Sequence, residues 1–563
     1  MPAVKQAAIL YATLTIALAW PLSAHLSTTV FSDGPDTNLY LWTLAWDTHA
    51  LVRHPLSMFD ANIYFPRPHT LAYSENLIGS ALFAAPVIWL TGNLVLAMNL
   101  LVMFGSILCG LGAYLLARKA GVTDRGALIA GVVFAFSPPR FLRLDQLHLA
   151  TIQWVAFGLA YLHAYLDDGR PRDVRLFLGF LTLQALTSGH GAVFLLLAAA
   201  VVVAYRVMLG EPLMLPRRAG DVGVVGALAI APAAVLMIPY WQVQRDVGLR
   251  RSLEGWTVSP ESFFASPSHA HQWLLGLFHA TRVNAAADAY LFPGFVPLAL
   301  ALAGLVGGVV ALRRRAPAGD WRGAVRRNAA LTYTLVALVS LLMAVGPRFS
   351  LWPLVYWLPG FNFIRAPSRF MLLALLGVAI VAGVGFDRLT RRARGQRWMF
   401  TAIVIALLVA EFAAMPFALT KKRVDIQPID RWLAAQPGVR AIAEVPLVDP
   451  RHLQASEMRH TDYMLHATSH WRKTVEGYSG IRPPSFERLY AELLQFPDET
   501  SLRSLTDLGV SHVIVHTDLY DPAEWALVET RLREFSALLR LEQIAGPGRI
   551  YALQGAPNQP TGR

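Results

Sequence analysis

The 563-residue sequence is poor in cysteine and in charged residues, and each shortage excludes classes of protein. Its single cysteine, Cys109, excludes a disulfide framework, a thiolate zinc cluster and an iron–sulfur site. Charged residues make up 15% of the chain, whereas soluble domains carry roughly a quarter. Since 55% of the residues are hydrophobic, this composition argues against a soluble cytosolic enzyme, a disordered protein and a coiled coil.

Long apolar runs, by contrast, are abundant. A helix needs about 20 mostly apolar residues to cross a bilayer, and several stretches approach that length. We predict a mainly α-helical integral membrane protein with about eleven crossings: 5–22, 94–117, 126–138, 149–166, 176–187, 192–208, 221–241, 290–312, 329–346, 368–387 and 398–416. The first stretch also resembles a secretory signal peptide, but we expect it to be retained, because its charged region is weak and many crossings follow.

The basic residues indicate how these helices are oriented. Cytoplasmic loops of membrane proteins are enriched in Lys and Arg. With a cytoplasmic N-terminus, the cytoplasmic pieces carry 21 basic residues, against 11 in the longer outward loops before residue 417. A crossing at 77–91 would reverse every later loop, so we predict an interfacial helix there. The net charge of +12 is therefore mostly an orientation signal, and no nucleic-acid partner is expected.

The composition changes near residue 417. We predict a transmembrane domain over 1–416 with a long outer loop at 23–93, followed by an extracytoplasmic domain over 417–563. In this second domain charged residues are frequent, and strand-like and helical patterns alternate, which is typical of an α/β domain. The strand-like runs are Ala441–Pro446, His512–His516 and Arg549–Leu553, and the clearest helical pattern is Pro522–Leu539.

The first outer loop contains acidic candidates. Asp33 and Asp36 flank a Gly-Pro turn before an aromatic stretch with Trp42 and Trp46. Because Trp suits the depth of lipid headgroups, we expect this stretch to lie along the membrane surface and to hold both carboxylates there. The alternative is that they are ordinary solvated aspartates or a helix N-cap. Glu75 is a further candidate, although it also suits a helix N-terminus.

The second outer loop places Arg140, Arg143, Asp145, Gln146 and His148 within nine residues. Polar groups at a membrane surface are unfavourable unless they pair or face a water-filled cavity. We therefore treat the two arginines and the histidine as candidate ligand-binding residues.

Later outward loops add two more groups of candidates. His190 lies in a small turn, where the alternative is an ordinary turn histidine, and Arg365 and Arg369 precede a helix. Paired guanidinium groups suit phosphate oxyanions, although lipid-headgroup contact or an ion pair is the alternative. His269-x-His271 lacks the spacing and the acidic or thiolate partners of a zinc site, so we expect no metal or other cofactor.

Several motifs together resemble a bacterial branch of the GT-C superfamily of polytopic glycosyltransferases. This superfamily includes oligosaccharyltransferase, protein O-mannosyltransferases and lipid A aminoarabinose transferases. The matching segments are Asp36 with Trp42–Asp47, Phe59–Pro66, Ser74-Glu75, Phe134–Pro138, Arg365-x-Pro-x-Arg369-Phe, His470-Trp471 and Gly477–Gly480. One departure is Gln146-Leu147-His148, where the branch tends to have His-Leu-Gln.

The resemblance implies transfer of a sugar from a polyprenyl-phosphate donor to a glycan, lipid or protein acceptor. The reaction would occur at the outer face of the bacterial cytoplasmic membrane. The roles it implies are Asp36 as base with Asp33 as second choice, Arg140 and Arg143 or Arg365 and Arg369 as phosphate ligands, His148 and His190 as orienting groups, and Tyr478 over the acceptor. A non-catalytic scaffold with the same fold, a lipid transporter and another lipid-linked transfer remain alternatives.

Overall fold

The computed structural model describes residues 2–211, 215–247, 253, 258–276, 290–315, 321–346, 350–358, 361 and 364–555. The chain divides into two compact units, which are described separately below. Unit 1 comprises Met1–Leu26, Asn99–Leu236 and Arg250–Leu419, and unit 2 comprises Ser27–Met98, Met237–Leu249 and Thr420–Arg563.

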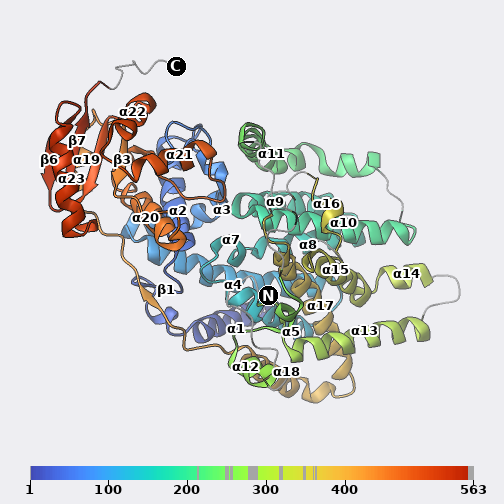
Figure 1. Ribbon diagram of the computed structural model, residues 1–563. Helices are drawn as coiled ribbons and strands as arrows, with labels where there is room; N and C mark the ends of the chain where they lie inside the picture. Colours follow the sequence, from blue (N-terminus) through green and yellow to red (C-terminus); the bar gives the residue numbers. More distant parts are fainter. Residues whose placement is uncertain are drawn as a thin grey trace. The chain divides into compact units, whose positions relative to one another are not determined.

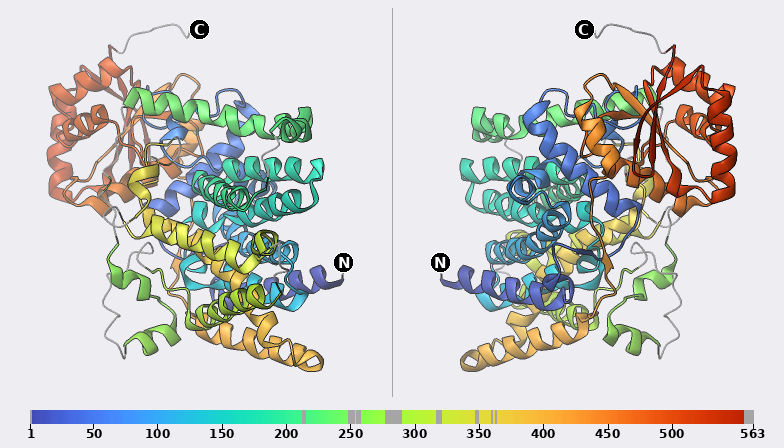
Figure 2. Two further views of the ribbon diagram at one scale, coloured as in Figure 1. Left: turned by 90° about the vertical axis from the view of Figure 1, so that its right-hand side faces the viewer. Right: turned by 90° about the vertical axis from the view of Figure 1, so that its left-hand side faces the viewer.

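Each of the eleven predicted crossings coincides with a helix, and most of these helices belong to unit 1. Figure 2 shows many of them running roughly side by side. Together with the shorter helices between them, the helices that lie wholly or mostly in unit 1 are α1 (Pro2–Leu18), α4 (Leu94–Lys119), α5 (Asp124–Phe136), α6 (Pro138–Phe141), α7 (Leu147–Ala150), α8 (Gln153–Asp168), α9 (Pro171–Thr187), α10 (Gly189–Met208), α11 (Leu215–Val247), α12 (His269–Gly276), α13 (Phe295–Arg315), α14 (Trp321–Arg326), α15 (Ala329–Ala344), α16 (Trp352–Val355), α17 (Met371–Leu389) and α18 (Arg397–Phe412).

Among the described residues, six helical segments are long and apolar enough to cross a membrane: Leu94–Lys119, Leu147–Asp168, Gly189–Met208, Arg218–Val247, Phe295–Arg313 and Pro367–Leu389. Three shorter apolar helices accompany them, Ala3–Leu18, Ile78–Thr91 and Ala329–Ala344. The chain is therefore a mainly α-helical, multi-pass membrane protein. The predicted crossings at 126–138, 176–187 and 398–416 are helices of 13 to 17 residues, shorter than the roughly 20 residues of a straight crossing.

Helix α17 lies at the centre of unit 1 and packs against α5, α13 and α15. Small residues allow this close approach, as is usual between membrane helices. A Cβ atom at Gly385 would collide with the carbonyl oxygen of Leu300 in α13. A polar contact fixes the same end of α17, where the Asp387 carboxylate accepts a hydrogen bond from the backbone N–H of Thr123, 2.7 Å away, at the start of α5.

Unit 2 is built on a five-stranded sheet with the order β4-β3-β5-β7-β6. Strand β3 runs parallel to β4 and β5, whereas β7 is antiparallel to β5 and β6. Figure 1 shows α19 and α23 beside this sheet. Its elements are α19 (Pro428–Ala435), β3 (Ala441–Val445), α20 (Leu453–His466), β4 (Lys473–Thr474), α21 (Pro484–Leu493), α22 (Glu499–Leu508), β5 (His512–His516), α23 (Pro522–Glu534), β6 (Leu539–Ala545) and β7 (Gly548–Leu553).

The three predicted strands of this region correspond to β3, β5 and β7, and the sheet confirms the predicted α/β domain. The helical pattern predicted over Pro522–Leu539 was too long. Helix α23 ends at Glu534, and Leu539 is the first residue of β6. Strand β6 exposes most of its side chains and lies at the edge of the sheet, where polar residues such as Arg540 and Glu542 are accommodated.

Most of the segment 23–93, which was predicted to be the first outer loop, folds together with the C-terminal region rather than standing alone. Strand β1 (Thr29–Val30) pairs with β2 (Thr420–Lys421). Asn62–Phe65 then continue the sheet at its β4 edge: the backbone N–H of Phe65 donates to the carbonyl of Thr474 at 3.0 Å, and that of Thr474 donates to Asn62 at 2.8 Å. The loop therefore shares one compact unit with the region after residue 417, which is why unit 2 is discontinuous in sequence.

Two helices of this loop differ in their surroundings. Helix α3 (Ile78–Thr91) occupies the stretch predicted to be interfacial. Helix α2 (Pro35–Arg53) contains the aromatic stretch that was predicted to lie at the membrane surface, but its side chains are buried from Thr37 through Thr48. Trp42 and Trp46 are both buried, and each donates its indole N–H within unit 2, Trp42 to Asn62 at 3.2 Å. The aromatic stretch is therefore part of the buried interior of unit 2.

Candidate functional site

Asp36 lies in the first turn of α2, where local sequence fixes its position. Gly34 has an extended backbone and Pro35 occupies the first helical position, where its fixed φ favours a helix start. The Asp36 side chain is exposed. A carboxylate at this end of a helix is stabilised by the helix dipole. The sequence therefore builds an accessible, oriented carboxylate at the start of the outer loop.

Tyr478, from the C-terminal part of unit 2, contacts this carboxylate. Its hydroxyl donates a hydrogen bond of 2.9 Å to Oδ1 of Asp36. Tyr478 follows Gly477, which packs so tightly on Tyr64 that a Cβ there would lie 2.7 Å from the tyrosine ring. The structure thus brings together the predicted base and the predicted tail tyrosine, which are 442 residues apart in the chain.

Asp33 has a different environment from Asp36. Its carboxylate forms an ion pair of 2.8 Å with Nζ of Lys422, which is largely buried. The ammonium group of Lys422 therefore occupies a carboxylate oxygen that an acceptor hydroxyl would need. Sequence reasoning missed Lys422, because the pairing depends on β1 meeting β2 and no spacing in the sequence encodes it.

Asn38 of α2 and Asp462 of α20, which sequence reasoning also missed, hold α2 in place. The side-chain amide of Asn38 donates to Oδ1 of Asp462 at 3.0 Å and to the hydroxyl of Thr461 at 3.1 Å, both in α20. Burial raises the pKa of the Asp462 carboxyl above its ordinary value. Asn38 follows Asp36 by two residues, so its place beside the candidate base was the only available signal.

Glu75, the third acidic candidate of the loop, lies between η2 (Thr70–Tyr73) and α3. It does not lie in the first turn of α3, which has no acidic residue. Instead, the side chain of Asn76 accepts the backbone N–H of Ile78 at 3.1 Å. The residues on either side of Glu75 are tied to Tyr240, whose hydroxyl donates to the carbonyl of Ser74 at 2.9 Å and accepts from Asn76 at 3.2 Å.

In unit 1 the side chain of Arg140 binds backbone carbonyls of neighbouring segments. Its side chain is 1% exposed, and its guanidinium donates to the carbonyls of Ala135 and Ala150, both at 3.0 Å, and to the hydroxyl of Ser106 at 2.8 Å. These bonds join the end of α5 to α4 and to the last residue of α7. A guanidinium with its donors committed to protein acceptors holds this loop together.

Arg143 is buried in the same loop. It donates to the carbonyl of Pro139 and to Oε1 of Gln146, both at 2.8 Å. His148, in α7, is also buried, and its ring lies 5.0 Å from that of His190 between centroids. The second outer loop therefore places Arg143 next to Gln146 and His148 next to His190.

His190 and Arg369 form the second pair that the structure brings together. Nη1 of Arg369 donates to Nε2 of His190 at 3.0 Å. His190 lies in the first turn of α10, and Arg369 lies in η7 (Pro367–Phe370), directly before α17. Arg365 precedes this 3-10 helix and is exposed. Unit 1 thus presents a half-buried guanidinium, an exposed guanidinium and two imidazoles as candidates for binding an oxyanion.

The histidines considered for zinc form hydrogen bonds in unit 1. Nε2 of His271 lies 3.0 Å from Oε1 of Glu411, and its Nδ1 lies 2.7 Å from the hydroxyl of Ser266. Glu411 also accepts the backbone N–H groups of Phe295 and Val296 at the start of α13. Glu411 therefore satisfies a helix N-terminus, and His271 supports it.

Comparison of the structure with solved proteins identifies its fold. The oligosaccharyltransferase of Archaeoglobus fulgidus, solved with zinc and sulfate, is similar over 95% of this chain and 71% of its own, with 13% identity and a TM-score of 0.50. The mycobacterial arabinofuranosyltransferase AftD is similar over 98% of this chain, with 16% identity and a TM-score of 0.54, although this chain spans only 41% of AftD.

A third structure has nearly the same length as this chain. ArnT from Cupriavidus metallidurans, solved with undecaprenyl phosphate, is similar over 98% of this chain and 99% of its own, with 12% identity and a TM-score of 0.50. No protein-family profile matches the sequence, and a search of curated proteins gives no match. At these identities the likeness concerns the fold: the chain has the fold of the GT-C membrane glycosyltransferases.

Proposed function

We propose that the protein is a glycosyltransferase that moves a sugar from a polyprenyl-phosphate donor to an acceptor hydroxyl at the outer face of the cytoplasmic membrane. The observation that supports it best is the exposed Asp36 carboxylate, oriented by Tyr478 at 2.9 Å, on a GT-C fold. The undecaprenyl phosphate bound by ArnT supports a lipid-linked donor.

In the proposed reaction the acceptor oxygen bonds to C1 of the donor sugar. The bond between C1 and the phosphate oxygen breaks, and the polyprenyl phosphate leaves with the electron pair. Asp36 takes the proton of the acceptor hydroxyl, as a general base does. We prefer Asp36 to Asp33 because the ammonium group of Lys422 occupies an oxygen of the Asp33 carboxylate, whereas the Asp36 side chain is exposed. Tyr478 holds the Asp36 carboxylate in one orientation.

The departing phosphate needs positive charge, which unit 1 supplies in this proposal. Arg369 and Arg365 are the phosphate ligands, because a guanidinium presents paired donors to oxyanions. His190 and His148 orient them, since Nε2 of His190 already accepts from Arg369 at 3.0 Å. Arg140 and Arg143 keep a positioning role, because Arg140 donates to the carbonyls of Ala135 and Ala150, and Nε and Nη1 of Arg143 donate to Pro139 and Gln146. Glu75 remains a candidate residue for binding the acceptor substrate.

The test is a transfer assay on membranes that contain the full chain, with a panel of labelled polyprenyl-phosphate hexoses and pentoses. Loss of a general base lowers rates by about 100-fold or more, so Asp36→Asn should lose activity to this extent. Tyr478→Phe and Asp33→Asn should lose less. The matched control is Asp507→Asn, which changes an exposed aspartate in α22. Equal turnover of Asp36→Asn and this control would refute the assignment of the base.

The alternative function is a scaffold with the same fold and no turnover, since folds do not fix function. It predicts that no donor in the panel is consumed by the wild-type protein. Arg369→Ala separates the two functions further, because a donor-binding role predicts a raised KM for the donor and a scaffold role predicts no donor kinetics to alter.

A further inference from the structure

Helix α3 exposes its bulky apolar side chains and buries its small ones. The exposed residues recur at the spacing of a single helix face: Leu82, Phe83, Pro86, Trp89 and Leu90. The buried face consists mainly of small residues: Gly79, Ser80, Ala81, Ala84 and Ala85. A helix on the surface of a soluble domain shows the reverse arrangement, so this face indicates contact with lipid.

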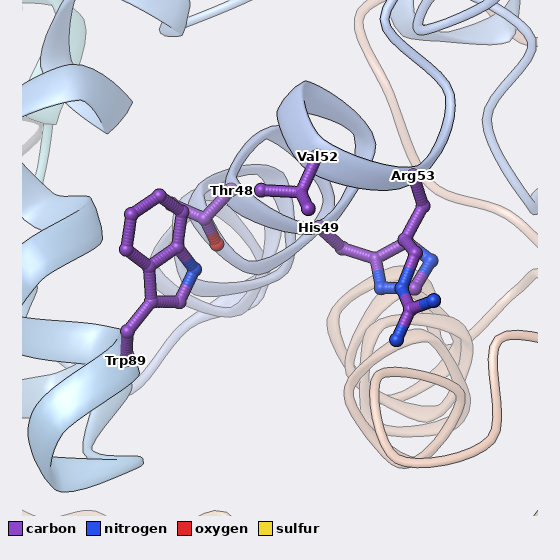
Figure 3. Close-up of a pocket in the computed structure, with 5 residues that line it drawn as sticks. All are labelled: Thr48, His49, Val52, Arg53 and Trp89. Atoms are coloured by element: carbon purple, nitrogen blue, oxygen red, sulfur yellow. The ribbon is translucent and has the colours of Figure 1, made fainter.

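A hollow of about 320 Å³ lies at the C-terminal end of this face. Figure 3 shows it between α2 and α3, with the Trp89 indole on one side and the Arg53 and His49 side chains on the other. Thr48 and Val52 complete the lining, and none of the five residues is acidic. Val52 is 62% exposed and Trp89 is 59% exposed. The hollow thus joins an apolar rim to a basic wall.

The charge of the hollow comes from Arg53. The neighbouring imidazole of His49 stacks on Trp471 with 4.0 Å between ring centroids. Burial, together with the positive charge of Arg53 and the nearby His54, lowers the pKa of His49 to about 4. His49 is therefore uncharged at neutral pH and forms a fixed wall. The Arg53 guanidinium carries the positive charge, and its planar fork suits phosphate oxygens.

We propose that this hollow binds the phosphodiester headgroup of an anionic membrane phospholipid. Arg53 donates hydrogen bonds to the phosphate oxygens, and the Trp89 indole lies at headgroup depth, where Trp is enriched. The acyl chains lie along the exposed face of α3. The positive charge and the absence of a lining carboxylate match an anionic headgroup.

This site is distinct from the one proposed for glycosyl transfer. Arg53 and Asp36 lie at opposite ends of α2. Since a helix rises about 1.5 Å per residue, they are roughly 25 Å apart. The inference therefore goes beyond the proposed function, and either can fail without the other.

The first test is native mass spectrometry of the full chain in detergent, titrated with phosphatidylglycerol. One arginine near an anionic lipid surface changes a dissociation constant about fivefold. For the most tightly bound phosphatidylglycerol molecule, Arg53→Ala should therefore raise the Kd about fivefold. The matched control, Arg503→Ala, removes an exposed arginine of α22 and should bind as the wild type does. Equal binding by the two variants would overturn the proposal, as would an equal loss of phosphatidylcholine binding.

A second arm separates a bilayer lipid from the lipid-linked donor. Undecaprenyl phosphate is added to the protein already loaded with phosphatidylglycerol. Retention of the phospholipid by the wild type supports the proposal. Displacement in the wild type with no corresponding effect in Arg53→Ala would make the hollow a donor site and would overturn it.

A third measurement does not depend on Arg53. Leu90 is 86% exposed, and the single native cysteine, Cys109, is fully buried, so Leu90→Cys directs a nitroxide label to the end of α3. In phosphatidylglycerol vesicles the label should be accessible to oxygen and shielded from a water-soluble nickel chelate. Free access of the chelate would show that this face is not in lipid and would contradict the proposal.

Discussion

Both compact units bury ionisable side chains, but the buried arginines lie in unit 1, whereas the most deeply buried carboxyl groups of the described residues lie in unit 2. The buried arginines are Arg140, Arg143 and Arg206, and the carboxyl groups are those of Asp47, Glu444 and Glu476. An isolated buried charge is very unfavourable. The two units avoid this cost in different ways, because an arginine cannot release its proton in a protein, whereas a carboxyl group can take one up.

Unit 1 keeps its charges and surrounds them with acceptors. Arg140 donates to two carbonyls and a hydroxyl. Arg206 forms ion pairs with Asp167 and with Glu211, the latter at 3.3 Å. Each guanidinium therefore joins segments that are separate in sequence, and removing it leaves several acceptors without a donor.

Unit 2 removes the charge from its acids. Glu444 and Glu476 lie at the carboxyl ends of β3 and β4, where the backbone N–H of Glu444 donates to Oε1 of Glu476 at 2.9 Å. Burial raises the pKa of each to about 8. Nε2 of His516 lies 2.8 Å from Oε2 of Glu444, and burial lowers the pKa of His516 to about 4. At neutral pH, the protonated carboxyl group of Glu444 donates a hydrogen bond to the uncharged imidazole of His516. A protonated carboxyl group is uncharged and needs no ion-pair partner. The stability of these sites should therefore depend more on pH than on any one neighbouring residue.

The strongest test of this contrast is Arg140→Ala. Each buried acceptor that loses its donor costs about 1–3 kcal/mol, and three acceptors are affected, so we expect unit 1 to lose about 3 kcal/mol or more. Thermal unfolding in detergent and the yield of monodisperse protein would measure this. The matched control is Arg172→Ala, which changes an exposed arginine of α9.

Similar melting temperatures for these two variants would break the comparison, because Arg140 would then not hold the loop together. Arg140→Lys should fall between the wild type and the alanine variant, since an ammonium group has three donors in a different geometry from the five of a guanidinium.

The second expectation concerns pH. The pKa of Glu444 and of Glu476 is about 8 in the fold, compared with an ordinary value of 4.5. The stability that these groups provide is therefore complete below about pH 4.5 and is lost as the pH rises through 8. For His516 the sign is opposite: its contribution is complete above pH 6.5 and is lost as the pH falls through about 4. Because two carboxyl groups outweigh one imidazole, the summed contribution is greatest near pH 4.5, and we expect the sheet to lose about 2 kcal/mol or more between pH 6 and pH 9.

Hydrogen exchange of peptides from β3 and β5, corrected for the intrinsic rate at each pH, would measure this loss. Peptides from α15 in unit 1 are the internal control, because the only ionisable side chain of that helix is Tyr333. A variant with Glu444→Gln and Glu476→Gln should retain its protection at pH 9. If exchange in the wild type is the same at pH 6 and pH 9, the carboxyl groups are already charged, and the contrast between the units is wrong.

The two units also differ in how far their sequences predicted them. Membrane helices are encoded locally by apolar length, and each predicted crossing coincides with a helix. In unit 2, the strands rich in Val and Ile were predicted, but β4 has only two residues and β6 alternates polar and apolar residues after a helix. No glycine or proline marks the end of α23 at Glu534, so the helical pattern extended into β6.

Contacts between distant segments could not be predicted in either unit. Asp36 and Tyr478 were each candidate site residues, but their hydrogen bond requires Asn62–Phe65 to join the edge of β4. The ion pair of Asp33 with Lys422 likewise depends on the pairing of β1 with β2. Residue type indicated which chemistry was present, and backbone pairing over several hundred residues determined which groups met.

The smallest expected effect is that of Asp47→Asn, and it examines the contrast at its most extreme point. Asp47 is fully buried, and neither carboxylate oxygen has a hydrogen-bond partner among the described residues. Burial raises the pKa of Asp47 well above its ordinary value, and the prediction for this position is an uncharged carboxylic acid. An amide has the same shape and charge, and we expect the free energy of unfolding to change by less than about 1 kcal/mol.

Asp47→Leu removes the unpartnered polar atoms and should not destabilise unit 2 more than its added volume requires. Thermal unfolding of the two variants decides the matter: a loss above about 3 kcal/mol for Asp47→Asn would mean that a buried, paired charge stands at position 47, and unit 2 would then hold a charge in the manner of unit 1.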